Sequence, residues 1–273
     1  MKISVVIICK NGSPHIAETI LSVQGIGEEI LVYDSGSSDD SIQIAKDFGV
    51  RIEQGSWEGY GKNRYKAAQL ATYDWILMLD TDEVLDDELK AALLKIDLAN
   101  DHLVYNMRYK NYFGNKLISH GEWGNDSHIR MANRKKVYTD QEIVHEKLFL
   151  QSGLSIHTLK GHILHYTVQN SNDFARKMME YARLSAEKYY KQGKRSSFLN
   201  ICISPLFSFL QNYFFKMGFL DGWKGFVIAT MTSWYTFMKY VQLRELKKQR
   251  IRYPALRKIR GYNKPKTNLS VSN

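Results

Sequence analysis

The chain has 273 residues, of which 44% are hydrophobic, 24% are charged and only four are proline, so it is neither disordered nor collagen-like. Its two cysteines, Cys9 and Cys202, lie in apolar runs and cannot build a disulfide framework, which predicts a reducing compartment. The net charge of +10 resides in residues 239–273, which hold eleven Lys or Arg residues and one Glu, while the remaining charges balance. This distribution predicts an anionic partner, either a membrane surface or nucleic acid.

The first eighty residues alternate between short apolar runs, which are typical of buried strands, and amphipathic stretches, which are typical of helices. The apolar run Ile3–Cys9 is too short for a signal peptide, so it predicts a buried strand and a cytoplasmic protein. Asn11–Pro14 breaks this run before a helix that Ser13 caps and that ends near Val23. Further strands are predicted over 29–34, 51–54 and 74–79, and further helices over 41–48 and 62–72. This order predicts an α/β fold with a mostly parallel central sheet, in which ligands bind beyond the carboxyl ends of the strands.

The second half of the chain changes character. We expect a helix over 84–100, short strands and loops over 103–170, and an amphipathic helix over 173–191. Two uncharged stretches follow, Ser196–Phe215 and Gly225–Met238. Pro205 interrupts the first, and the second is too short for a hydrocarbon core of about 30 Å. We therefore expect a helical hairpin at a membrane interface, with an ordinary buried pair and true membrane spans as the alternatives.

Asp80-Thr81-Asp82-Glu83 follows the predicted buried strand 74–79. Two carboxylates two residues apart at a strand end repel each other unless a cation lies between them. Their hard oxygen atoms suit Mg²⁺ or Mn²⁺, which also bind substrate phosphates. The structural alternative is a solvated helix N-terminus, which suffices for Asp86, Asp87 and Glu88.

Four segments carry a resemblance to a known family: Ile3–Asn11, Leu31–Asp39, Trp57–Asn63 and Asp80–Glu83. In order and spacing, over about residues 1–170, they resemble the family-2 inverting glycosyltransferases of GT-A fold. A closer resemblance is to the subgroup of lipopolysaccharide-core β-1,4-glucosyltransferases. That subgroup shares Trp57-Glu58-Gly59-Tyr60-Gly61, Val144-His145-Glu146 and a segment like Gly218–Phe226. One departure is Gly12, where the family usually has Glu after Asn.

The resemblance implies a role for each matching residue on the donor side. Lys10 and Asn11 would line the nucleoside pocket, and Asp34 would bind the base. Lys62 and Asn63 would lie near the base or diphosphate. Asp80 would face the ribose and donor sugar. Asp82, with Asp80, would hold a Mg²⁺ or Mn²⁺ ion that bridges the diphosphate.

An inverting transfer also needs a general base for the acceptor hydroxyl. The resemblance favours Glu146, because the family places its base in the Val-His-Glu motif, and His145 would orient it or approach the metal. Asp126 is the alternative base, in a loop that resembles an acceptor rim. Trp123 in the same loop would stack on a sugar of the acceptor, with core packing as its alternative.

We therefore expect a metal-dependent hexosyltransferase that moves glucose from a UDP-sugar to a lipid-linked glycan such as lipopolysaccharide core, with another cell-envelope or capsular polysaccharide as the alternative product. It would bind the inner face of the cytoplasmic membrane peripherally. Residues 1–195 would form the catalytic domain, 196–243 the membrane-associating helices and 244–273 a disordered basic tail.

A nucleotidyltransferase would need a Gly-rich loop with basic residues where Asn11–Pro14 stands. A nucleic-acid-binding protein that uses the basic tail is the alternative from another class, but the tail lacks a recognition motif and we expect no nucleic-acid partner.

Overall fold

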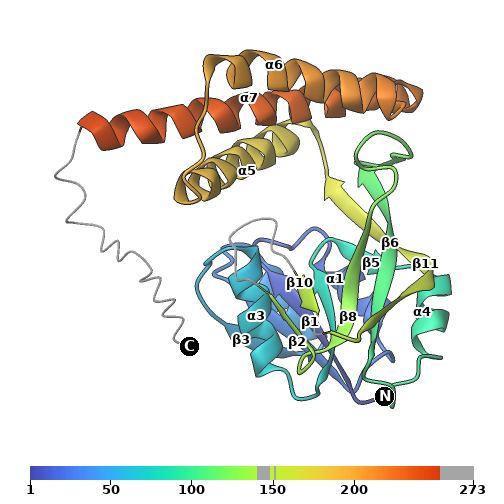
Figure 1. Cartoon of the computed structure of the whole chain (residues 1–273). Helices are drawn as coiled ribbons and strands as arrows, with labels where there is room; N and C mark the ends of the chain where they lie inside the picture. The colour runs from blue at the N-terminus through green and yellow to red at the C-terminus, as the bar shows by residue number, and fades with distance from the viewer. Residues whose placement is uncertain (140–147, 151, 253–273) are drawn as a thin grey trace, which may run out of the picture.

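The computed structural model describes residues 1–139, 148–150 and 152–252, and its centre is a nine-stranded mixed sheet (Figure 1). The strand order is β3-β2-β1-β4-β8-β6-β11-β5, and β7 pairs with β6. The strands are β1 (Ile3–Cys9), β2 (Glu29–Asp34), β3 (Arg51–Gln54), β4 (Trp75–Asp80), β5 (Glu83–Leu85), β6 (Leu103–Phe113), β7 (Lys116–Leu117), β8 (Ser127–Asn133) and β11 (Ser155–Val168). A separate two-stranded sheet pairs β9 (Val137–Thr139) with β10 (Leu148–Leu150).

The N-terminal half is the parallel, doubly covered sheet that the sequence predicts. β1 pairs with β2 and β4 in parallel, and all seven β1 residues are buried. Ile3, Val5 and Ile7 pack with α1 (Ile16–Val23), α2 (Ser41–Asp47) and α4 (Asp87–Leu93), whereas Val6 and Ile8 pack with α3 (Tyr60–Leu70). The register places Cys9 opposite Asp34 and Ile8 opposite Asp80, so the three strand ends meet at one edge.

Three expectations about single elements are wrong. Ser13 does not cap α1, because its N–H donates to the Asp39 carboxylate and the helix begins only at Ile16. The predicted helix over 84–100 is instead strand β5 followed by the short helix α4, which Asp86 caps. The strands of the region 103–170 are not all short, since β6 has 11 residues and β11 has 14.

Three helices lie together on one side of the sheet (Figure 1). They are α5 (Ser171–Lys191), α6 (Phe198–Leu210) and α7 (Gly222–Arg252), with a π-helical turn (Gln211–Phe215) and a 3₁₀ turn (Gly218–Asp221) between α6 and α7. Phe174 of α5 and Ile228 of α7 pack on Phe113 and Val168, at the ends of β6 and β11. Helix α7 runs through residue 243, so the expected boundary there falls inside a continuous helix.

Most apolar side chains of α6 face outward. Within the described residues, one helical stretch, Phe198–Phe215, is long and apolar enough to cross a membrane, and 11% of it is buried. Phe198, Ile203, Leu206 and Phe207 are all more than half exposed. The helix therefore presents an apolar surface that the rest of the described chain leaves uncovered.

Candidate active site

The residues predicted to bind a nucleoside lie at the carboxyl ends of β1 and β2. Asp34 is buried, and its carboxylate accepts hydrogen bonds from the N–H groups of Gly36 and Ser37 at 3.0 and 3.1 Å. Asn11 has a φ of 55°, and its side-chain oxygen accepts from Ser38 N–H at 2.8 Å. These bonds fix the turn after β2 beside the end of β1.

The loop from Gly55 to Gly59 is held against this edge by Asn63. The Asn63 side chain is fully buried, donates to the Ser35 hydroxyl and the Ser56 carbonyl, and accepts from Glu58 N–H. Asn63 thus organises the loop, and its direct contact with a donor stays a prediction. Lys62 is partly exposed and pairs with Glu58 at 3.5 Å.

The loop also carries Trp57, whose ring lies under the Lys10 ammonium, 5.1 Å from ring centroid to nitrogen. At Gly12, which follows Asn11, the family's usual Glu would require Thr81 to move. A Cβ atom there would lie 2.6 Å from Cβ of Thr81. Gly12 thus lets the ends of β1 and β4 approach closely.

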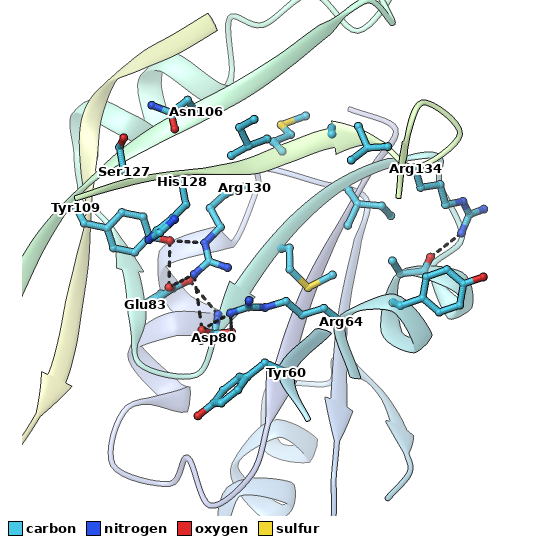
Figure 2. Close-up of a pocket in the computed structure, with 18 of the residues that line it drawn as sticks. Tyr60, Arg64, Asp80, Glu83, Asn106, Tyr109, Ser127, His128, Arg130 and Arg134 are labelled. Carbon is cyan, nitrogen blue, oxygen red and sulfur yellow. Dashed lines mark hydrogen bonds and ion pairs between the residues drawn. The ribbon is translucent and has the colours of Figure 1, made fainter. Parts of the chain in front are cut away.

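Asp80 lies in a buried ionic cluster at the end of β4 (Figure 2). Arg64 of α3 donates to both Asp80 carboxylate oxygens at 2.8 and 2.7 Å. Arg130 of β8 approaches Asp80 at 3.6 Å and bonds to Glu83 and to the hydroxyl of Tyr109. Two guanidinium groups thus balance two carboxylates inside the fold.

The pKa values of the two carboxylates in this cluster are shifted in opposite directions. Burial alone would raise the pKa of Asp80, but the charges of Arg64 and Arg130 outweigh it and hold the pKa at about 2. Glu83 is fully buried, and its desolvation raises its pKa despite the Arg130 charge. Asp80 is therefore firmly ionised and already paired with two arginines.

Asp82 and His165 form the part of the site that fits a divalent metal. His165 Nε2 lies 3.7 Å from Asp82 Oδ1. Its other ring nitrogen, Nδ1, is 2.8 Å from Asn111 Oδ1, an atom that also accepts from the Thr167 hydroxyl. Because Asn111 Oδ1 only accepts, Nδ1 of His165 donates to it, and this bond orients the ring with Nε2 toward Asp82.

The carboxylate of Asp82 suits Mg²⁺ or Mn²⁺, and the imidazole of His165 suits a transition metal such as Mn²⁺ better than it suits Mg²⁺. Among the residues that the structure describes, no three His, Cys, Asp or Glu side chains are arranged to hold a metal. A metal at Asp82 and His165 would therefore complete its coordination with diphosphate oxygens and water. Lys177 of α5, 3.8 Å from Asp82, adds a positive charge beside the same place.

A cavity of about 1030 Å³ opens next to the ionic cluster, and Asp80, Asp126, His128 and His165 are among its lining residues. Asp126 Oδ1 lies 3.0 Å from His128 Nε2. Burial would raise the pKa of Asp126, but His128 and Asn111 outweigh it and lower the pKa. Asp126 is thus an ionised carboxylate in the cavity wall, with a reduced affinity for a proton.

The other acceptor-side predictions have different outcomes. Trp123 packs edge-on against Phe174, with 5.3 Å between ring centroids, so the core-packing alternative describes its observed contact. Its stacking on a sugar stays a prediction. Glu146 and His145 lie outside the described residues.

His165 of β11 lies in the strand-like stretch 161–166, where the sequence favours a structural histidine over a zinc ligand, yet its ring lies beside Asp82. Arg64 of α3 and Arg130 of β8 are site residues that the sequence did not single out, and both reach Asp80. Tyr181 is another, since α5 carries its hydroxyl to 3.3 Å from that of Tyr60 at the cavity. One local signal was available: Arg130 stands between Ile129 and Met131 in strand β8, and an arginine drawn into the fold needs a carboxylate partner.

Comparisons with known proteins agree on one family. The family model described as glycosyl transferase family 2 matches residues 4–155. An uncharacterized glycosyltransferase of Rickettsia felis is 30% identical over 98% of this chain and 99% of its own length. The lipopolysaccharide core biosynthesis glycosyltransferase LpsC of Rhizobium meliloti is 25% identical over 87% of this chain and 90% of its own length.

Solved structures show a more distant likeness. TarS of S. aureus in complex with UDP-GlcNAc is 15% identical, with a TM-score of 0.45 over 91% of this chain and 92% of that one. The glucosyl-3-phosphoglycerate synthase of Mycobacterium tuberculosis, in complex with Mn²⁺, UDP-glucose and glycerol 3-phosphate, is 21% identical, with a TM-score of 0.34 over 42% of this chain and 45% of that one.

Proposed function

The chain belongs to glycosyl transferase family 2, an inverting family, and from that premise we propose that it transfers a hexose from a UDP-sugar to a lipid-linked glycan of the cell envelope, with a divalent metal. The observation that carries the metal-dependent part is the pair formed by Asp82 and His165, with Asn111 fixing the ring of His165. The pair lies at the sheet edge where the ends of β1 and β2 gather Lys10, Asn11 and Asp34.

Each group at this edge has a distinct task in the proposed reaction. Asp34 and Asn11 bind the nucleoside, and Lys10 with Trp57 covers it. Asp82 and His165 would hold Mg²⁺ or Mn²⁺, which when bound would supply positive charge beside the leaving diphosphate. Asp80 would face the ribose and donor sugar, held in place by Arg64 and Arg130.

The transfer itself needs one proton acceptor. The acceptor hydroxyl oxygen attacks the anomeric carbon, the bond from that carbon to the diphosphate oxygen breaks, and the hydroxyl proton passes to a carboxylate. Glu146 is the first candidate base and Asp126 the second. The lowered pKa of Asp126 favours Glu146, because a weaker base gains less from accepting the proton.

The acceptor class and the location rest on two further observations. The relative LpsC is named for lipopolysaccharide core biosynthesis, which makes a lipid-linked core glycan the first acceptor to test. The uncovered apolar face of α6 lies beside basic residues of α7, since Phe198, Arg244, Lys247 and Lys248 line one small hollow. Apolar and basic side chains together suit an anionic membrane surface, which supports a location on the cytoplasmic face of the membrane, next to such an acceptor.

A binding experiment tests the donor and metal assignment directly. Thermal unfolding is measured with UDP-, GDP-, TDP- and CMP-sugars, with and without Mn²⁺. A UDP-sugar at 100 times its dissociation constant should add about 2.7 kcal/mol of stability, and the effect should need the metal. His165→Ala should lose the Mn²⁺ dependence, whereas His162→Ala, whose ring pairs with Asp86 instead, should keep it. Equal stabilisation without metal, or by an unrelated nucleotide sugar, would contradict the proposal.

A further inference from the structure

The segment Gly218–Phe226 fastens the helical hairpin of α6 and α7 to the loop that leads into β8. Gly225 lies against Gly218, where an added Cβ atom would be 1.8 Å from the Gly218 carbonyl oxygen. The left-handed φ of 66° at Gly222 then starts α7 at once. We call residues 216–225 the hairpin turn and residues 118–126 the rim loop.

Asp221 is the centre of the contact between them. Its side chain is buried, and its two carboxylate oxygens accept hydrogen bonds from Ser119 N–H at 3.2 Å and His120 N–H at 2.8 Å. The next N–H, that of Gly121, donates to the Lys216 carbonyl at 2.8 Å. Three successive amides of the rim loop thus bond to the hairpin turn.

Two lysines complete the attachment between the hairpin turn and the sheet. Lys116 of β7 donates to the Asp221 carbonyl, and Lys224 donates to the Phe113 carbonyl at 2.7 Å. The His120 ring also lies 3.4 Å from the Asp221 carboxylate. The Asp221 carboxylate, the Lys216 carbonyl and the Lys224 ammonium are therefore all directed at the rim loop or at the strand end before it.

The far side of the rim loop reaches the proposed active site. Asn111 donates to the Trp123 carbonyl at 2.9 Å, and the same side chain orients His165 through its oxygen. Tyr109 N–H donates to the Asp126 carbonyl at 2.9 Å, which holds Asp126 in the cavity wall. Hydrogen bonds thus lead from Asp221 through the rim loop to Asn111, His165 and Asp126.

We propose that Asp221 is a positioning residue that ties the acceptor-binding side of the site to the helical hairpin. The hairpin of α6 and α7, which carries the uncovered apolar face, then also fixes the position of the rim loop. Attachment to the membrane and binding of a lipid-linked acceptor are therefore mechanically connected. This inference rests on the proposed function for its acceptor, but the contact between Asp221 and the rim loop can be tested alone.

Asp221→Asn is the informative variant, because it keeps the shape of the side chain but turns one acceptor oxygen into a donor that faces an N–H. Hydrogen exchange at the amides of residues 119–121 should accelerate at least about tenfold. With UDP-glucose and truncated-core lipopolysaccharide in phosphatidylglycerol vesicles, the apparent KM for the acceptor should rise at least about fivefold.

Tyr235→Phe is the matched control. It removes a hydroxyl that pairs with Ser185 at 2.9 Å between α7 and α5, and so perturbs helix packing without touching the rim loop. Unchanged exchange at residues 119–121 in Asp221→Asn, or an equal rise of the acceptor KM in Tyr235→Phe, would overturn the assignment. If the wild-type enzyme does not turn over UDP-glucose, the proposed donor fails, whereas the exchange measurement still decides whether Asp221 sets the loop.

Discussion

Glu146 and Asp126 are the two carboxylates considered for the acceptor proton, and paired amide substitutions distinguish them. Glu146→Gln should bind the UDP-sugar normally but transfer at least about a hundredfold more slowly, the usual scale for losing a general base. Asp126→Asn should have a smaller effect, because the pairing with His128 lowers the pKa and weakens that base. Single-turnover rates and donor affinity measure the two steps separately. The reverse order of losses would assign the base to Asp126.

Asp80 gives the protein a predictable response to acid. Its pKa is about 2 in the fold, against about 3.9 in an unfolded chain, so the unfolded state takes up more protons between these values. The stabilisation from Asp80 is therefore present above pH 4 and is lost as the pH falls toward 2. Its size is on the order of 2 kcal/mol.

Denaturant unfolding of Asp80→Asn, measured from pH 5 to pH 2.5, checks this response. The difference in unfolding free energy from the wild type should shrink as the pH falls, because unfolded wild-type Asp80 takes up a proton that folded Asp80 does not, and Asn takes up none. Asp87→Asn, at a fully exposed carboxylate of α4, is the matched control. A difference that stays constant across this range would show that Asp80 is not the ionised partner of the two arginines.

The site residues predicted from the sequence agree best with the structure where the residue stands at the end of an apolar strand. Asp34, Asp80 and Asp82 were predictable because β2 and β4 are apolar runs with polar ends, and parallel strands bring such ends together. The positions of Arg130 and His165 were not, since their approach depends on the pairing of β4 with β8 and of β5 with β11. Those pairings join residues far apart in the chain, which local periodicity does not encode.

At the scale of elements, strand β11 shows how a glycine lets helix and sheet meet. Gly161 lies where the register of β11 against β6 shifts, and its φ is 86°. A Cβ atom added to Gly161 would lie 2.2 Å from the backbone nitrogen of Leu89 in α4. Asp86, which caps α4, also accepts from His162 N–H at 3.0 Å. The sequence predicted a helix already from residue 84 because it could not reveal that residues 83–85 pair with β11.

Gly161→Ala tests this close approach. The change should lower the unfolding free energy by at least about 2 kcal/mol, since it adds a backbone clash to the strain of a left-handed conformation. Gly153→Ala has a similar φ of 89° but no neighbour within 4 Å, so it should cost about 1 kcal/mol. Urea unfolding of both variants gives the comparison. Equal losses would mean that backbone conformation alone, and not space, requires glycine at 161.

At the scale of the whole molecule, charge and apolar surface are concentrated in the same C-terminal part. The charges outside residues 239–273 balance, whereas that stretch holds the net charge of +10. The exposed apolar residues of α6 begin beside Arg244, Lys247 and Lys248 of α7. Basic residues near an anionic surface contribute about 1 kcal/mol each, reduced by salt, and apolar side chains add a part that salt does not weaken.

Vesicle flotation of point variants tests whether α6 meets the membrane. Point variants keep α5 and α7 in place, and these helices cover Phe113 and Val168. The full chain should float with phosphatidylglycerol vesicles and be released only in part by high salt. Replacing Phe198, Leu206 and Phe207 with Ser should weaken binding at least about tenfold, because each buried side chain of this size contributes about 1.5–3 kcal/mol. Leu21 and Leu94 are similarly exposed, at 52% and 53%, but lie on α1 and just after α4, so their Ser variants should float like the wild type. Equal flotation of the α6 variant, or loss in the Leu21 and Leu94 variant, would show that α6 is not the surface that meets the membrane.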